Sequence, residues 1–167
     1  MSVKKTSSKP DGAPTESQPP TLDLDSSVPV LVTILANRIT TSGSTTFRRR
    51  HGIGSTEWKV LSTIAIESHV TGARISQLVG IDRAAVSRVL KGFVERGLIQ
   101  VDQSARHSNY QSVTLTAAGE KLHDEAIITA FEREKLLLQP FSAREKTQLV
   151  QLLRKLIDQS RALTQAG

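Results

Sequence analysis

The chain has 167 residues, 38% of them hydrophobic, and no cysteine. This length allows one domain with a core of ordinary size, while the absence of thiols excludes disulfides, a thiolate nucleophile and a cysteine-ligated zinc site. A net charge of +6 favours polyanionic partners. No apolar run approaches the roughly 18 residues of a membrane helix, and the first residues lack the apolar core of a secretion signal. We therefore expect a cytoplasmic protein without a membrane partner.

The N-terminal segment divides into a polar tail and a helix. Residues 1–27 are rich in Ser, Pro, Thr and Lys and offer almost nothing to bury, which predicts a disordered tail. Leu31, Leu35 and Ile39 recur at helical spacing and predict a helix entered near Pro29. Residues 40–46 hold Gly and β-branched side chains, which weaken a helix. Whether this helix continues, kinks or frays there stays open. The three cations of residues 48–50 suit its C-terminus, where the helix dipole favours positive charge.

Three shorter helices are predicted next, each from a capping residue and an apolar stripe. Ser55 can cap a helix that runs to about Ser68. Thr71 caps a short helix that ends at Gly80. Asp82 caps a further helix that ends at Gly97.

A hairpin and two long helices complete the chain. Residues 98–101 and 111–115 read as two strands joined by a polar loop. Thr116 caps a helix over about 117–139, which Pro140 stops. Ser142 and Glu145 have capping-box spacing before a last helix, whose apolar stripe contains Leu149, Leu152, Leu153 and Leu156. The predicted fold class is mainly α, with about six helices and a small β-hairpin wing.

The helix after Asp82 carries the most informative pattern. One face holds Val86, Val89, Leu90 and Phe93 at the spacing of a core-facing stripe. The opposite face is small, polar and cationic, with Arg83, Ala84, Ser87, Arg88 and Lys91. Such a face suits a DNA major groove, because small residues allow close approach, Arg can bind guanine through two hydrogen bonds and Lys can neutralise phosphate. The alternative is an ordinary amphipathic helix whose charged face meets solvent.

This region resembles the helix-turn-helix of MarR-type (multiple antibiotic resistance) regulators, on the run Ile75-Ser76-Gln77-Leu78-Val79-Gly80-Ile81-Asp82-Arg83-Ala84-Ala85-Val86-Ser87-Arg88. The flanks 47–61, Glu95-Arg96-Gly97-Leu98-Ile99 and Leu115-Thr116-Ala117-Ala118-Gly119 are similar to the family as well. The resemblance covers about residues 28–163. It implies a winged helix-turn-helix over about 55–116, flanked by dimerisation helices over about 28–50 and 117–163. It also implies a homodimer on a palindromic operator in double-stranded DNA.

One departure concerns the tip of the wing. Where the family usually carries an arginine for the minor groove, this chain has Ser108 and Asn109. Arg106 is two positions earlier and can replace that cation, together with His107. The residues that we expect to contact DNA are therefore Thr71, Arg74, Asp82, Arg83, Ala84, Ser87, Arg88, Lys91, Arg106 and His107.

The resemblance further implies a repressor that a small molecule releases, such as an aromatic acid. A cation, an imidazole and an indole can together hold an aromatic carboxylate. The candidate ligand-binding residues are Arg50, His51, Trp58, Leu61 and Ser62. For Trp58 and Leu61 the core is the alternative. The four histidines show no metal-ligand spacing, and neither a phosphate loop nor a nucleophile elbow is present, so we expect no enzyme, cofactor or metal. An architectural DNA-binding protein without effector and a winged-helix protein-interaction module stay as alternatives.

Overall fold

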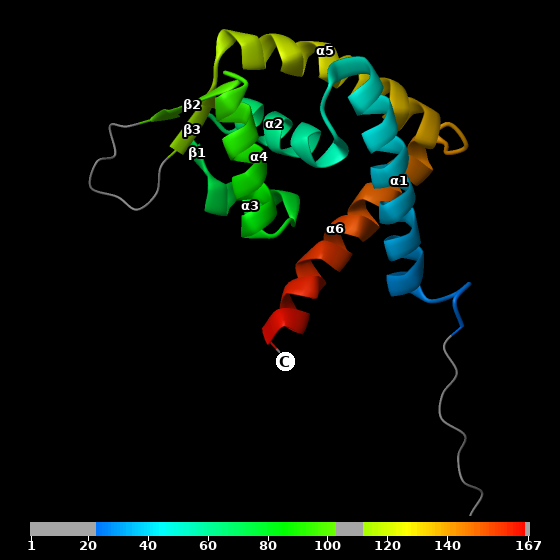
Figure 1. The fold of residues 1–167 in the computed structure, drawn as a ribbon. Helices are drawn as coiled ribbons and strands as arrows, with labels where there is room; N and C mark the ends of the chain where they lie inside the picture. The colour runs from blue at the N-terminus through cyan, green and yellow to red at the C-terminus, as the bar shows by residue number, and fades with distance from the viewer. Residues whose placement is uncertain (1–22, 103–111, 166–167) are drawn as a thin grey trace, which may run out of the picture. The chain divides into compact units, whose positions relative to one another are not determined.

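The computed structural model describes residues 23–102 and 112–165. Six helices and three short strands make up this part of the chain (Figure 1), which confirms the predicted mainly helical class with a small wing. In chain order they are α1 (Val28–His51), α2 (Ser55–Ile66), β1 (Val70–Thr71), α3 (Gly72–Val79), α4 (Arg83–Glu95), β2 (Ile99–Asp102), β3 (Ser112–Leu115), α5 (Ala117–Leu137) and α6 (Ala143–Gln165). The chain divides into two compact units, Met1–Asn37 and Arg38–Gly167.

The described part of the first unit contains a turn and the start of α1. The Asp23 carboxylate accepts hydrogen bonds from the Ser26 hydroxyl, at 2.6 Å, and from the Asp25 amide, at 3.0 Å. The hydrogen bond from Ser26 is the main reason that the pKa of Asp23 is below its ordinary value. Residues 23–27, which the predicted tail includes, form a turn with these hydrogen bonds just before α1. Residues 1–22 lie outside the described part.

The structure resolves the open question about α1, because the helix is continuous over residues 40–46. Packing holds this weak stretch. Gly43 is buried, and a Cβ on it would lie 2.5 Å from the Ser55 hydroxyl oxygen. That hydroxyl donates to the Thr40 carbonyl oxygen at 2.9 Å and so ties α2 to α1.

The predicted cap of α2 is wrong by one residue, because Gly54 and not Ser55 is the N-cap. Since glycine has no side chain, the cap uses Glu57, whose carboxylate accepts the Gly54 N–H at 2.6 Å. The helix also ends at Ile66, two residues earlier than predicted. The caps at Thr71, Asp82 and Thr116 are confirmed, because each side chain accepts a backbone N–H three residues ahead.

The sheet is antiparallel and has the order β1–β3–β2. β3 pairs with β2 on one side, with Ile99 opposite Leu115, and with β1 on the other, with Val70 opposite Val113. Two strands were predicted, and β1 is an addition that sequence reasoning missed. β2 also extends to Asp102, which was assigned to the loop.

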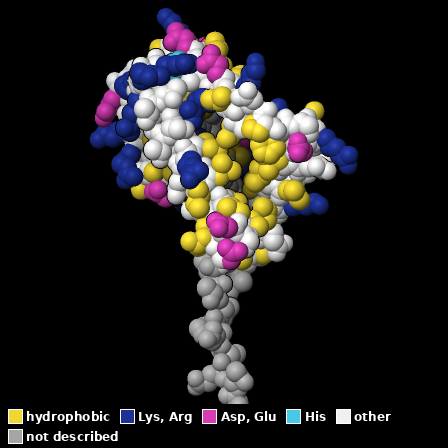
Figure 2. Space-filling view, turned by 90° about the vertical axis from the view of Figure 1, so that its right-hand side faces the viewer, with side chains coloured by type: hydrophobic (Ala, Val, Ile, Leu, Met, Phe, Trp, Pro, Cys, Tyr) yellow, Lys and Arg dark blue, Asp and Glu magenta, His cyan; other side chains and the backbone are white. Residues whose placement is uncertain are grey.

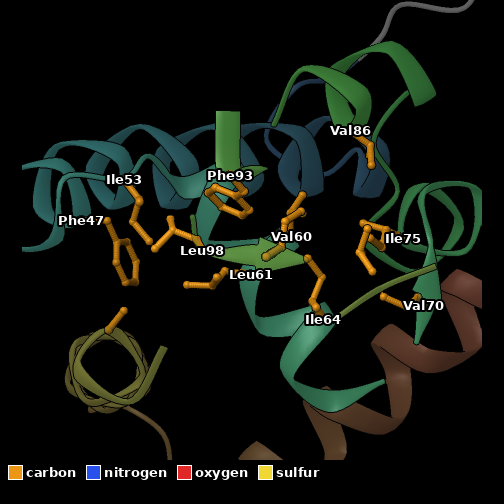
Figure 3. Close-up of a cluster of buried hydrophobic side chains, with 13 residues drawn as sticks. Phe47, Ile53, Val60, Leu61, Ile64, Val70, Ile75, Val86, Phe93 and Leu98 are labelled. Atoms are coloured by element: carbon orange, nitrogen blue, oxygen red, sulfur yellow. The ribbon is translucent and has the colours of Figure 1, made fainter. Parts of the chain in front are cut away.

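One hydrophobic core holds the winged part together (Figure 3). α2, α3, α4 and the three strands all contribute to it, and α1 and α5 add Phe47 and Ala126. Val86 and Phe93 are the residues of α4 that are buried, at 1% and 0% exposed. Because these two side chains anchor α4, the opposite face of the helix is turned outward.

The two C-terminal helices follow the predicted pattern closely. α5 ends at Leu137, slightly before the predicted Gln139. The capping box before α6 is confirmed, because the Glu145 carboxylate accepts the Ser142 N–H at 2.8 Å and the Ser142 hydroxyl accepts the Glu145 N–H at 3.3 Å. Among residues 23–102 and 112–165, no helix is long and apolar enough to cross a membrane.

Candidate nucleic-acid interface

A tight turn between α3 and α4 sets the direction of α4. Gly80 adopts a left-handed conformation with φ of 69°, which glycine tolerates without strain. The Ser76 carbonyl oxygen accepts the Gly80 N–H at 3.0 Å, and the Ser76 hydroxyl donates to the Ile81 carbonyl oxygen at 2.6 Å. Asp82 then caps α4 by accepting the Ala85 N–H at 2.8 Å. This helix–turn–helix leaves Arg83 and Ala84, the first two residues of α4, exposed.

The structure brings five of the predicted DNA-contacting residues together on one side of α4. All five are exposed: Arg83, Ala84, Ser87, Arg88 and Lys91. The Lys91 ammonium lies 4.0 Å from a carboxylate oxygen of Glu95, one turn further along the helix. The face therefore carries three cations between small side chains, as sequence reasoning predicted.

Two hollows flank this face of α4. The wing-side hollow has a volume of about 400 Å³, and Arg83, Ser87 and Lys91 line it together with apolar side chains of α4, β2 and β3. The second hollow, which we call the α1–α4 hollow, has a volume of about 410 Å³. Arg88 lines it together with Ser44 and Arg48 of α1 and with residues 54–57 at the start of α2. Arg83 and Lys91 thus border the hollow on one flank of this face, and Arg88 borders the hollow on the other flank.

The two predicted residues at the start of α3 have partners within the protein. The Thr71 hydroxyl accepts the Arg74 N–H at 3.2 Å as the helix cap. The Arg74 guanidinium binds both carboxylate oxygens of Glu67, at 3.1 and 2.9 Å, and also lies 3.3 Å from the Gln77 side-chain oxygen. The hydrogen bond from Arg74 lowers the pKa of Glu67, and the same bond raises the pKa of Arg74. A phosphate would therefore have to compete with Glu67 for Arg74.

The base of the wing is described, but its tip is not. Arg106 and His107 lie outside the described residues, so their expected DNA contacts stay predictions. At the base, His69 Nδ1 lies 3.5 Å from a carboxylate oxygen of Asp102. His69 has φ of 59°, a conformation that is uncommon outside glycine. Sequence reasoning gave this residue no role.

Three of the five predicted ligand residues meet α5. The Arg50 guanidinium lies 2.6 Å from a Glu132 carboxylate oxygen, and His51 Nε2 lies 2.8 Å from the Thr129 hydroxyl. The ring of Trp58 stacks between Phe47 and His123, with centroid distances of 5.3 and 5.6 Å. Sequence reasoning missed His123 and Thr129, because their approach to α1 and α2 depends on tertiary packing.

The other two predicted ligand residues are separate from this group. Leu61 is 0% exposed in the hydrophobic core, so a ligand would have to enter the core to touch it. The Ser62 hydroxyl donates to the Lys59 carbonyl oxygen on its own helix, at 3.1 Å. The core interpretation therefore accounts for Leu61, and none of the five lines the wing-side hollow or the α1–α4 hollow.

A helix-turn-helix followed by a small antiparallel wing, with a cationic face on its second helix, defines a winged helix-turn-helix protein. The MarR family model matches residues 51–108. A MarR/EmrR family transcriptional regulator from Acinetobacter sp. ADP1 is similar at 34% identity and a TM-score of 0.80, over 84% of this chain and 99% of that one. The chain belongs to the MarR family, whose members are transcriptional regulators and not enzymes.

More distant structures share the fold. The PcaV regulator from Streptomyces coelicolor, solved with its natural ligand, is 20% identical with a TM-score of 0.68, over 83% of this chain and 97% of that one. MepR from S. aureus, solved with DNA, is 18% identical with a TM-score of 0.70, over 81% of this chain and 97% of that one. None of the curated proteins matches this sequence.

Proposed function

We propose that this protein regulates transcription by binding a specific DNA sequence with α4. The observation that carries the proposal is the exposed face of Arg83, Ala84, Ser87, Arg88 and Lys91, held outward by the burial of Val86 and Phe93. The MepR–DNA complex supports DNA binding as a use of this fold. Arg88 is the proposed base-contacting residue, and Lys91, near the end of the helix, the proposed phosphate contact. As a regulator of transcription, the protein is proposed to act in the cytoplasm.

The protein is proposed to act as a homodimer on a palindromic operator. Large apolar side chains are exposed on the helices outside the winged part, a pattern that marks interaction sites. Hydrophobic side chains are visible at the surface in Figure 2. α6 alone exposes Val150, Leu152, Leu153, Leu156, Ile157 and Leu163. In the first unit, Leu31 and Leu35 are 45% and 46% exposed.

A small aromatic acid is the proposed effector, and its release of a repressor from DNA the proposed response. Arg50, His51 and Trp58 support a site for it, because they offer a cation, an imidazole and an indole next to α5. PcaV, which was solved with its natural ligand, supports ligand response on this fold. A ligand there would compete with Glu132 for Arg50 and with Thr129 for His51.

Selection of bound duplexes from a random DNA pool tests the DNA-binding proposal. A sequence-specific regulator is expected to enrich one inverted repeat. Retention of all sequences alike would instead indicate an architectural protein, and no retention at low salt would indicate a protein-interaction module.

A further inference from the structure

We infer that Arg48, near the end of α1, is a DNA-backbone contact, so that the DNA-binding surface extends beyond the winged part onto α1. The inference rests on the proposed function. It assigns a role to an arginine that sequence reasoning interpreted as part of a helix terminus. The partner that we propose for Arg48 is a phosphate of the DNA strand that lies next to Arg88.

The pairing of the arginines within the protein is the first observation. Arg50, Arg74, Arg96, Arg133 and Arg161 all bind carboxylates, hydroxyls or carbonyl oxygens. The side chains of Arg48 and Arg88, by contrast, have no hydrogen-bond or ion-pair partner in residues 23–102 and 112–165. Both are exposed. Their guanidinium groups are thus free to bind an external anion, as are those of five other arginines in the same described ranges, Arg38, Arg49, Arg83, Arg144 and Arg154.

The position of Arg48 is the second observation. Both arginines line the α1–α4 hollow, although one comes from α1 and the other from α4. A Cβ built on Gly54 would lie 3.4 Å from Arg48 Nε, which places the guanidinium over the start of α2. The nearby carboxylate of Glu57 is already used, because it accepts the Gly54 N–H at 2.6 Å and lies 3.3 Å from Arg96 Nη1. Glu57 therefore leaves the charge of Arg48 without an ion-pair partner.

The charge and setting of this hollow favour a nucleic-acid phosphate. Arg48 has no ion-pair partner within the described residues, and a DNA phosphate would supply the missing counter-charge. An arginine binds phosphate through two parallel hydrogen bonds. If Arg88 reads a base in the major groove, the backbone of that strand runs along the flank of α4, where the hollow lies. Arg48 is then a positioning contact that fixes the protein's register on DNA and carries no sequence information.

The test compares variants on two duplexes, the one recovered by the selection and a scrambled duplex of the same composition. Arg48→Ala is expected to weaken binding to both equally, by roughly eightfold at 0.1 M salt, and to reduce the slope of log K against log salt by about 0.9. Arg48→Lys is expected to keep most of the slope, because it keeps the charge. Arg38→Ala is the matched control, since Arg38 is an exposed arginine of α1 that does not line the hollow.

An unchanged slope in Arg48→Ala overturns the inference, and so does an equal reduction in Arg38→Ala. A loss on the selected duplex alone overturns it as well, because it would indicate a base contact. The inference is also overturned if inorganic phosphate releases DNA far better than chloride does at equal ionic strength. That result would indicate a site for free oxyanions instead. In each of these cases the preference of the unaltered protein for the selected duplex would still stand, so that failure of the inference is distinct from failure of the proposed function.

Discussion

Arg88 carries the sharpest prediction at the scale of single residues. Arg88→Ala is expected to weaken binding to the operator far more than to unrelated DNA, by about 1–3 kcal/mol, because a two-pronged guanine contact would be lost. Competition binding with the two duplexes measures this difference. Lys91→Ala is the comparison, because a lost phosphate contact should weaken both complexes about equally. An equal loss in Arg88→Ala would reassign that residue to the backbone.

The Glu67–Arg74 pair predicts a pH dependence. Because the hydrogen bond from Arg74 lowers the pKa of Glu67 in the folded protein, the pair stabilises the fold above the ordinary glutamate pKa. This stabilisation is lost as the pH falls through the lowered value, and it is small because the pair is exposed. An NMR titration of the Glu67 carboxyl in Arg74→Ala should give a higher midpoint than in the unaltered protein. The same midpoint in both would contradict the pairing.

Residue roles could be predicted from the sequence where they depend on local spacing. Asp82 and Thr71 cap their helices as expected, because a cap needs only its own backbone three residues ahead. Roles that depend on packing were missed. Arg74 lies seven residues from Glu67, and Trp58 meets His123 only because α5 packs against α2. Sequence spacing holds no signal for either contact.

At the scale of elements, Gly119 joins α5 to the wing. A Cβ on Gly119 would overlap the backbone carbonyl oxygen of Leu98, which accepts the Thr116 N–H at 3.0 Å. Gly119→Ala is expected to destabilise the protein by about 1–3 kcal/mol or more, because neither backbone can give way easily. Chemical denaturation measures the change.

Gly92→Ala is the matched control for this prediction. Gly92 is also helical, but a Cβ there would meet nothing within 4 Å. Alanine is the better helix former by roughly 1 kcal/mol, so this variant should be neutral or more stable. Equal loss of stability in both variants would show that the close approach at Gly119 is not the cause.

The bounds of an element could be predicted where its sequence pattern is long. The prediction failed where a strand is too short to show a pattern. β1 has two residues, too few for an alternating pattern, and it exists because Val70 pairs with Val113 on β3. α1 continues through its weak stretch for a similar reason. Arg133 of α5 donates to the Ser42 hydroxyl at 2.7 Å and to the Thr46 hydroxyl at 3.2 Å, which adds support from outside the helix.

At the scale of the whole molecule, the apolar side chains of α6 predict an association. Leu153→Asp is expected to give monomers or aggregates, because a carboxylate would be buried in an interface that otherwise gains about 25 cal/mol per Å² of apolar area. Removal of all residues after Pro140 should act in the same way. Sedimentation measures the outcome. Ile66→Asp is the control, because Ile66 is 81% exposed and belongs to α2 and not to α6. A monomeric Leu153→Asp variant with full operator affinity would rule out the dimer proposal.

Footprinting of the unaltered protein on the selected duplex tests the central claim most directly. A dimer that reads DNA with two α4 helices is expected to protect two half-sites related by a two-fold axis. Their centres should be about 34 Å apart, one turn of the double helix. Protection of a single half-site, or an even pattern without boundaries, would contradict the account.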